Sequence, residues 1–227
     1  MTNSTLKNFV ARIVPPRLIS ELNFEAKMIA LKITNNLLPH RKTTLSRIRA
    51  LRELKVNIGC GPFKAEGWLN VDLDKSADLQ IDIRYGLPFS DGSCRFIFSE
   101  HVFEHLDLEE LRKLLGDCYR SLEPGGAIRI IMPNLACLIR AYSDNDREFV
   151  QAVMNEDITC TAFINRIFYH PTHRYIHDFE SISSILKEVG FTKVYNSSYK
   201  NSLFPELNID SELPHRKLDS LYVEAVR

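Results

Sequence analysis

The chain has 227 residues, of which 44% are hydrophobic and 26% are charged, and its formal net charge at pH 7 is zero. This length and composition suit one α/β domain with an extension and exclude wholesale disorder. The five cysteines form no Cys-x-x-Cys pair, and no apolar stretch reaches the roughly 20 residues that span a bilayer, which argues against a disulfide framework, a zinc knuckle and a transmembrane helix. Because the N-terminus also lacks the apolar core of a signal peptide, we expect a cytoplasmic protein.

Positive charge is concentrated in residues 1–54, which hold ten Lys or Arg and three Glu. The remaining residues, 55–227, hold 19 basic and 26 acidic side chains, so the two parts carry +7 and −7. We therefore expect a basic helical N-terminal extension over 1–54 and the main domain over 55–227. A basic extension of this kind suits an acidic partner, an anionic membrane surface or the acidic body of the same protein.

Within the extension, apolar residues recur at three- and four-residue steps and predict a helix over residues 17–38. They are Leu18, Leu22, Ala26, Ile29, Ile33 and Leu37. A second basic segment, 45–54, leads into the main domain. We expect the apolar face to pack on that domain, and docking to a membrane-bound or anionic acceptor is the alternative.

From residue 55 onward, predicted strands and helices alternate. Strands are expected at 55–58, 68–72, 79–83, 94–99, 126–131, 191–198 and 219–226. Helices are expected at 107–122, 134–142, 145–155 and 179–189. The alternation predicts an α/β fold with a doubly wound, mostly parallel sheet of seven strands.

The most informative segment is the first strand and the turn that follows it. The strand at 55–58 leads into Gly59 and Gly61, and the next strand ends at Asp72. Glycines let the backbone turn sharply and present bare N–H groups, while a carboxylate can bind the paired hydroxyls of a ribose. A dinucleotide motif would need a third glycine where Lys64 stands, and an acid about 20 residues on. Because the acid follows far sooner, the pattern favours an adenosine-containing cofactor without phosphates, namely S-adenosylmethionine.

Four blocks in sequence order resemble the class I S-adenosylmethionine-dependent methyltransferases. They are Val56–Pro62 with Gly67–Asp72, Asp82–Ile83 with Leu87–Ser93, Ser99–Leu106, and Leu122–Gly126 with Met132–Asn134. The chain is similar to the ubiquinone-biosynthesis-type, or methyltransferase type 11, group, and to its small members found with polysaccharide biosynthesis genes. The resemblance covers about 55–226 and implies a Rossmann-like fold, bound S-adenosylmethionine and methyl transfer.

The resemblance also implies cofactor contacts at the ends of the first four strands. The residues concerned are Asn57, Gly59, Cys60, Gly61, Asp72, Asp82, Ile83, Ser99 and Glu100. Asp72 would accept hydrogen bonds from both ribose hydroxyls, and Asp82 from the adenine amine, with the Ile83 amide on a ring nitrogen. Asn57 stands where the family often has an acid that contacts the ammonium group of the cofactor. Ser99 and Glu100 would border the sulfonium. A turn acid is the alternative for Asp72, and a helix-cap acid for Asp82.

Two histidines are candidate catalytic residues. A hydroxyl acceptor must lose a proton during methyl transfer, and His101, at the end of the fourth strand, is the first candidate for the general base. A structural role is its alternative. His173 is expected to line the acceptor pocket, within a polar segment over 170–178. That segment holds three histidines, but no cysteine accompanies them, so the sequence predicts no metal site.

The sequence thus predicts a cytoplasmic methyltransferase that acts on a hydroxyl of a small or glycan-related acceptor. One alternative is a scaffold or regulator that binds S-adenosylmethionine without catalysis. The other is a nucleic-acid methyltransferase that uses the basic extension for phosphate contacts. No Asn-Pro-Pro-Tyr-type motif or cysteine nucleophile supports nucleic acid as the partner.

Overall fold

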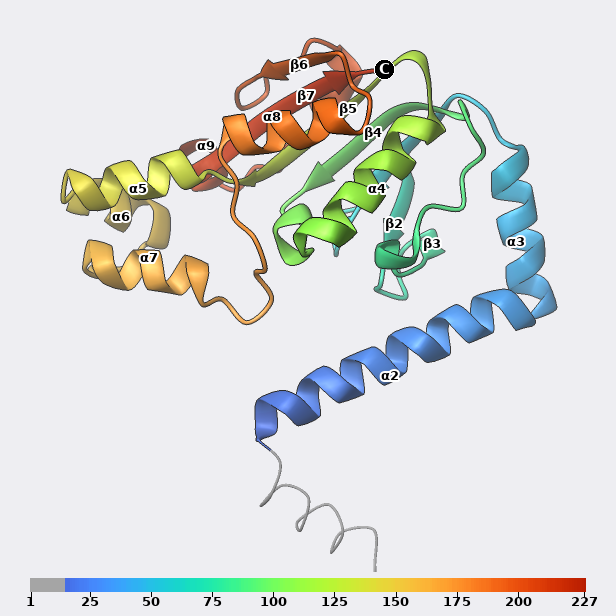
Figure 1. The fold of residues 1–227 in the computed structure, drawn as a ribbon, viewed down its shortest axis with the longest axis horizontal. Helices are drawn as coiled ribbons and strands as arrows, with labels where there is room; N and C mark the ends of the chain where they lie inside the picture. The colour runs from blue at the N-terminus through green and yellow to red at the C-terminus, as the bar shows by residue number, and fades with distance from the viewer. Residues whose placement is uncertain (1–14) are drawn as a thin grey trace, which may run out of the picture. The chain divides into compact units, whose positions relative to one another are not determined.

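The computed structural model describes residues 15–227, and among them seven strands form one sheet in the order β3-β2-β1-β4-β5-β7-β6 (Figure 1). The strands are β1 (Leu54–Ile58), β2 (Leu69–Asp72), β3 (Leu79–Gln80), β4 (Cys94–Glu100), β5 (Leu122–Pro133), β6 (Lys193–Asn196) and β7 (Ser220–Val226). The predicted fold class, a mostly parallel Rossmann-like sheet, is confirmed.

The strand order changes direction at β1. From there the chain moves outward through β2 and β3, which pair in parallel, and then returns to place β4 and β5 in parallel on the other side of β1. Only β7 runs against its neighbours, since it pairs antiparallel with both β5 and β6. The carboxyl ends of β1 and β4 are therefore adjacent, with Ile58 opposite Ser99. Open α/β sheets bind their ligands at such a switch point.

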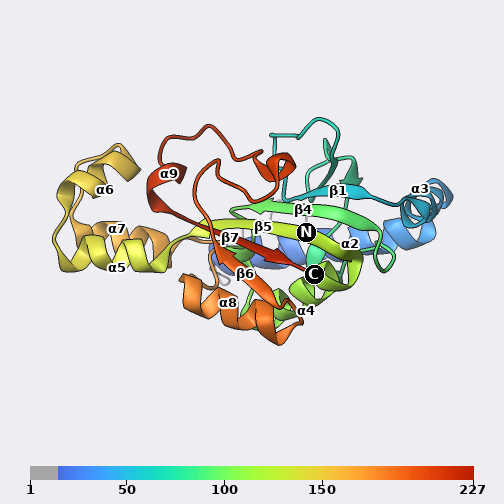
Figure 2. The ribbon, with the colours of Figure 1, turned by 90° about the horizontal axis from the view of Figure 1, so that it is seen from above.

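Helices cover the sheet and extend beyond its carboxyl edge. They are α4 (Leu108–Ser121), α5 (Leu135–Ser143), α6 (Arg147–Met154), α7 (Cys160–Phe168), α8 (Phe179–Glu188) and α9 (Arg216–Asp219), with 3₁₀ turns η1 (Ile83–Tyr85), η2 (Phe103–His105) and η3 (Pro205–Leu207). Figure 2 shows α4 and α8 on one face of the sheet and the segment between β6 and β7 on the other. Helix α7 was not among the predicted helices.

Helix α4 begins at a capping box, which fixes the preceding turn η2. The Asp107 carboxylate accepts a hydrogen bond from the Glu110 N–H at 2.9 Å, and the Glu110 carboxylate accepts one from the Asp107 N–H at 3.1 Å. This exchange satisfies N–H groups that have no partner inside the helix. The helix then buries Leu111 and Leu115 beneath it. As a result, η2 is held between β4 and a well-anchored helix.

Two hydrophobic clusters lie on different parts of the fold. One packs the segment between β6 and β7 on the sheet and contains Trp68, Phe96, Phe98, Ala127, Ile131, Leu207 and Tyr222. The other joins α5, α6 and α7 and contains Leu138, Ala141, Val150, Val153, Cys160, Phe163 and Ile176. This second cluster supports the chain that leads from α7 to His173.

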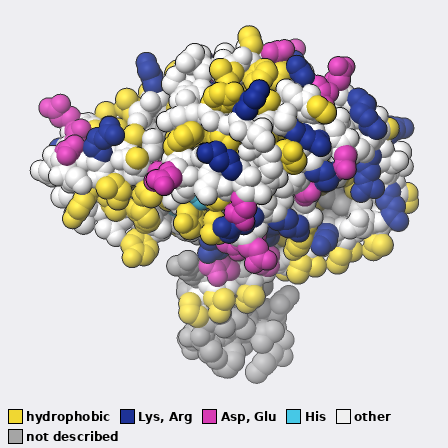
Figure 3. Space-filling view, turned by 45° about the horizontal axis from the view of Figure 1, so that its top comes forward, with side chains coloured by type: hydrophobic (Ala, Val, Ile, Leu, Met, Phe, Trp, Pro, Cys, Tyr) yellow, Lys and Arg dark blue, Asp and Glu magenta, His cyan; other side chains and the backbone are white. Residues whose placement is uncertain are grey.

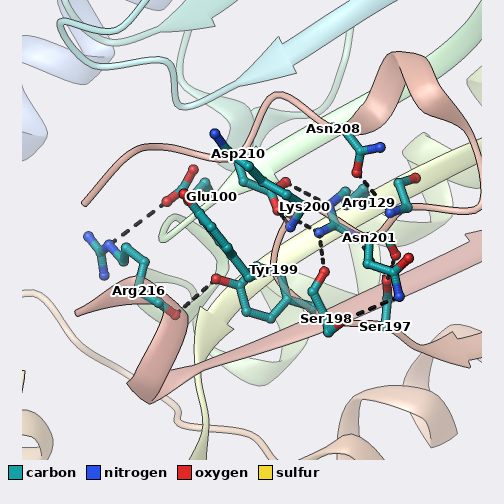
Figure 4. A network of polar contacts seen from close by, with 12 residues as sticks. Glu100, Arg129, Ser197, Ser198, Tyr199, Lys200, Asn201, Asn208, Asp210 and Arg216 are labelled. Atoms are coloured by element: carbon teal, nitrogen blue, oxygen red, sulfur yellow. Dashed lines mark hydrogen bonds and ion pairs between the residues drawn. The ribbon is translucent and has the colours of Figure 1, made fainter. Parts of the chain in front are cut away.

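A buried ionic network ties the segment after β6 to the sheet (Figure 4). Arg129, in β5, is 0% exposed, and its guanidinium contacts Asp210 and Glu224 at 2.6 Å each. It also donates to the Ser197 hydroxyl at 3.1 Å and the Ser198 carbonyl at 2.8 Å. Because all of these partners accept, the buried charge has a full set of hydrogen bonds.

The chain divides into two compact units, Met1–Ser46 and Arg47–Arg227. The first contains α2 (Pro16–Leu37) and the start of α3 (Pro39–Ala50), so the second basic helix begins before the predicted segment. The large apolar side chains of α2 that are exposed are Leu18, Leu22, Phe24, Ile29, Ile33 and Leu37. Their packing on the main domain, and the domain boundary after residue 54, stay predictions.

The first 14 residues of the basic extension lie outside the described residues. Across the part of the chain that is described, no helix has both the length and the apolar character needed to cross a membrane. Figure 3 shows lysine and arginine side chains interspersed with acidic and hydrophobic ones on the visible face.

Candidate active site

The turn after β1 contains two glycines with different roles. Gly59 has φ +73°, and a Cβ there would lie 2.0 Å from Val102 Cγ2, so close packing requires a glycine. Gly61 has φ +50°, and a Cβ there would meet no heavy atom within 4 Å. The turn is therefore packed tightly on the chain after β4 at its first glycine, and it borders open space at its second.

Asp72, at the end of β2, lies against this turn. Its Oδ2 accepts a hydrogen bond from the Gly61 N–H at 2.8 Å, and its Oδ1 accepts one from the Asp74 N–H at 2.8 Å. An ionised carboxylate offers about four lone-pair directions, so two stay available for ligand hydroxyls. The structure thus brings together the turn and the acid that the sequence paired.

Asn57 and Cys60 flank the turn and are both buried. The Asn57 Nδ2 donates a hydrogen bond to Asn70 Oδ1 at 3.0 Å, between the neighbouring strands β1 and β2. Burial, followed by the nearby charge of Asp72, raises the pKa of the Cys60 thiol to about 11. A thiol with this pKa is protonated near neutral pH, so Cys60 packs within the turn and does not act as a nucleophile.

Asp82 caps η1, the turn that begins at Ile83. Its Oδ1 accepts from the Arg84 N–H at 3.0 Å, and the Arg84 guanidinium contacts both carboxylate oxygens. The closest of these contacts joins Arg84 Nη2 and Asp82 Oδ2 at 2.6 Å. Four contacts use the lone pairs of the carboxylate. An adenine amine could bind Asp82 only if Arg84 moved away from one of the two carboxylate oxygens of Asp82.

Ser99 and Glu100 end β4 beside the switch point. Ser99 is 1% exposed, and its Oγ has no hydrogen-bond partner among the described residues. A buried hydroxyl without a partner costs stability, and a bound ligand can supply one. Glu100 instead faces the segment before α9, where the Ser211 N–H and hydroxyl both donate to its carboxylate. Arg216, the first residue of α9, lies 3.9 Å from the same carboxylate (Figure 4).

His101 lies in a chain of polar contacts, with φ +52° in the left-handed region. Its Nε2 is 2.9 Å from Ser220 Oγ, and its Nδ1 is 3.0 Å from Glu104 Oε1. Burial, and next the charge of Arg216, lowers the pKa of His101 to about 3. The ring is thus neutral near pH 7, and its contact with Glu104 is a hydrogen bond. Burial also raises the pKa of Glu104, whose side chain is 2% exposed.

His173 lies on the other side of Glu104. One ligand atom from each of Glu104, His105 and His173 falls within 4.8 Å of the others. The two predicted catalytic histidines are therefore not paired directly, but each lies beside the same buried carboxyl group. Burial lowers the pKa of His173. In the sequence, the His-x-x-Glu spacing from 101 to 104 could have indicated Glu104 as a partner of His101. Ser220 lies too far along the chain for any spacing to indicate its contact with His101.

These features fit a sulfonium-bearing nucleoside without phosphates. The site offers a glycine turn with open space, a carboxylate with free lone pairs beside it, and a buried serine hydroxyl that needs a partner. The turn also lacks the long helix on which a pyrophosphate usually rests.

Comparison with known proteins agrees with this chemistry. Residues 57–130 match a family model described as a methyltransferase domain. The matched range runs from β1 into β5 and includes Gly59, Asp72, Asp82 and His101. No curated protein matches the chain.

Several solved structures are similar to the chain at low identity. One is an S-adenosylmethionine-dependent methyltransferase from Archaeoglobus fulgidus, at 19% identity over 87% of this chain and 99% of that chain, with a TM-score of 0.48. Another, from Thermotoga maritima, has 18% identity over 89% and 97%, with a TM-score of 0.48. A phosphoethanolamine N-methyltransferase 2 from Haemonchus contortus has 16% identity over 82% and 51%, with a TM-score of 0.45.

Proposed function

Because the chain contains a class I S-adenosylmethionine-dependent methyltransferase domain, we propose that it methylates a hydroxyl of a small or glycan-related acceptor. The observation that carries the cofactor part of the proposal is the contact between the Gly61 N–H and Asp72 at the switch point of the sheet. It assembles a backbone turn and a carboxylate where ligands bind in this architecture.

Residues at the ends of four strands would hold the cofactor, which supplies an electrophilic methyl group on a sulfonium. Asp72 accepts hydrogen bonds from the two ribose hydroxyls through the lone pairs that Gly61 and Asp74 leave. The turn from Gly59 to Gly61 would bind the methionine part, and the buried Ser99 hydroxyl would gain a hydrogen-bond partner. Asn57, Cys60, Asp82, Ile83 and Glu100 complete the proposed set.

His101 and Glu104 would handle the proton of the acceptor hydroxyl. In the structure, Ser220 Oγ donates to Asp219 at 3.1 Å, so it accepts from the His101 Nε2–H, which leaves the lone pair of the neutral ring on Nδ1, 3.0 Å from Glu104 Oε1. Nδ1 would take the proton of the acceptor hydroxyl as the methyl group bonds to its oxygen, and the Glu104 carboxylate, 3.0 Å from Nδ1, would stabilise the positive charge on the ring. His173, across Glu104, is proposed to line the acceptor pocket. Positioning of acceptor and methyl group in line supplies much of the acceleration.

Calorimetry with S-adenosylmethionine and S-adenosylhomocysteine tests the cofactor part. We expect Asp72→Ala to weaken binding about tenfold or more, since one hydrogen bond to a charged group contributes about 1.5–3 kcal/mol. Asp74→Ala, at the exposed neighbouring acid, is the matched control and should bind nearly as the wild type does. Failure of the folded wild-type protein to bind either compound would refute the proposal.

Turnover with a panel of sugars, lipids and nucleic acids tests the acceptor part. We expect methylation of a hydroxyl compound, and His101→Ala should keep cofactor affinity while it loses turnover. Binding without turnover on any acceptor would favour the scaffold alternative. Salt-sensitive turnover on RNA or DNA alone would replace the small acceptor with a nucleic acid.

A further inference from the structure

A buried glutamate and two histidines converge beside the carboxyl edge of the sheet. Glu104 and His105 belong to η2, after β4, while His173 comes from the segment after α7. One carboxylate oxygen and one nitrogen from each ring lie within 4.8 Å of one another. The backbone holds the two segments together, since the N–H groups of Arg174 and Tyr175 donate to the Glu104 carbonyl at 2.8 and 3.3 Å.

Both rings are held by the same nitrogen, which contacts a backbone carbonyl. His105 Nδ1 lies 3.1 Å from the Thr172 carbonyl, and His173 Nδ1 lies 2.7 Å from the Ile167 carbonyl. A carbonyl can only accept, so Nδ1 is the donor in each ring, and Nε2 is the nitrogen that holds the lone pair in the corresponding tautomer of neutral imidazole. Histidines that bind metals are oriented in this way, with the second nitrogen donating to a backbone carbonyl or a carboxylate.

The carboxyl group of Glu104 supplies an independent sign of a missing partner. Its side chain is 2% exposed, and while Oε1 contacts His101, Oε2 has no hydrogen-bond partner among the described residues. Leaving a buried carboxyl oxygen without a partner is costly. A cation bound between this oxygen and the two Nε2 atoms would satisfy it.

We propose that Glu104, His105 and His173 form a binding site for a divalent transition-metal ion, with Zn²⁺ as the best-fitting ion. Two imidazoles and one carboxylate are a ligand set that Zn²⁺ uses, at bond lengths of about 2.0–2.2 Å. Ligand atoms around such an ion lie about 3.4 Å apart, so small side-chain rotations close the site from its present spread. The exposed His170 ring, 4.4 Å from His173 by centroids, lies outside the group of three.

Three protein ligands leave a fourth position for water or a substrate oxygen, as in catalytic zinc sites. The site also touches the proposed proton-handling pair, since Glu104 contacts His101 through its other oxygen. The sequence predicted no metal site because no cysteine accompanies the histidines of 170–178, whereas the fold takes the ligands from two distant segments. This inference does not rest on the proposed methyl transfer.

Zn²⁺ titration of the chelator-treated full-length protein tests the site. We expect saturable binding of one ion per chain by calorimetry, and the visible absorption of four-coordinate Co²⁺ when cobalt is added instead. Each of Glu104→Gln, His105→Ala and His173→Ala should weaken Zn²⁺ binding at least tenfold, because each removes a direct ligand. His40→Ala and Glu109→Gln, at exposed positions, are matched controls and should leave the affinity unchanged.

Circular dichroism and urea unfolding establish that each variant is folded. If Glu104→Gln does not fold, the two histidine variants decide the matter. Absence of saturable Zn²⁺ binding by the wild type overturns the proposal, as does unchanged affinity in both histidine variants. Because these measurements need no S-adenosylmethionine, Zn²⁺ binding by a protein that fails to bind the cofactor would uphold the metal site while the proposed function falls.

Discussion

At the residue scale, His177 couples stability to pH. Its side chain is buried, with Nδ1 2.6 Å from Ser181 Oγ, and burial lowers its pKa to about 4, against an opposing effect of Asp178. The unfolded chain binds a proton below about pH 6.5, while the folded ring stays neutral down to about pH 4. The free energy of unfolding therefore falls as the pH drops through this window.

We expect His177→Gln to reduce the stability loss between pH 7 and pH 5 by about 2 kcal/mol. Urea unfolding of both proteins at a series of pH values measures this difference. His40→Gln, at an exposed position, is the control, and its pH dependence should follow the wild type. An identical pH dependence in His177→Gln and wild type would show that the ring does not carry the effect.

Arg129 is the residue whose loss should destabilise the fold most. Its guanidinium lies between Asp210 and Glu224, all three nearly inaccessible to water. Arg129→Met should cost about 3–5 kcal/mol in urea unfolding, because it leaves two buried carboxylates without their cation. Adding Asp210→Asn and Glu224→Gln should recover part of that loss. A cost below about 1 kcal/mol for the single change would contradict the role assigned to the network.

At the element scale, the turn between β1 and β2 depends on its first glycine. Gly59→Ala adds a Cβ 2.0 Å from Val102 Cγ2 and places a side chain at φ +73°. The left-handed backbone alone costs about 1–2 kcal/mol, so we expect a larger total loss of stability together with loss of cofactor affinity. Chemical unfolding and calorimetry measure the two effects.

Gly116, inside α4, is the matched control for this substitution. A Cβ there meets no heavy atom within 4 Å, and its φ is ordinary for a helix. Gly116→Ala should therefore stabilise the protein by about 0.5–1 kcal/mol and leave cofactor affinity unchanged. Equal destabilisation by both changes would show that the turn has no special demand for glycine.

Elements with strong local patterns were predicted well, and those without were not. The first, fourth and last strands and helix α8 lie close to the predicted ranges. β3 is shorter than expected, because Asp82 pairs with Arg84 and starts a 3₁₀ turn where the strand was predicted to continue. Helix α7 was missed, although Thr159 caps it and Phe163 lies at a helical step in its buried face. Its apolar residues pack with α5 and α6, a partnership that no local pattern shows.

At the scale of the whole molecule, the strands that form the site all lie in the compact unit Arg47–Arg227. We expect a chain shortened to residues 47–227 to fold and to bind S-adenosylmethionine with affinity within about twofold of the full chain, because the residues proposed to contact the cofactor lie in this unit. Calorimetry on both proteins provides the comparison, with circular dichroism as the check of folding. A folded but non-binding shortened chain would place part of the site in residues 1–46.

The sequence by itself determined the fold class and the nature of the cofactor turn. Gly59, Gly61 and Asp72 are close in the chain, and their chemistry follows from local backbone geometry and the alternation of strands and helices. Only the tertiary structure decided which groups meet Glu104. His101, His173 and Ser220 come from three separate segments, and sheet register and the packing of α7 bring them together. Burial then lowers the pKa of His101 and raises that of Glu104, and burial is a property of the packed molecule that sequence spacing does not contain.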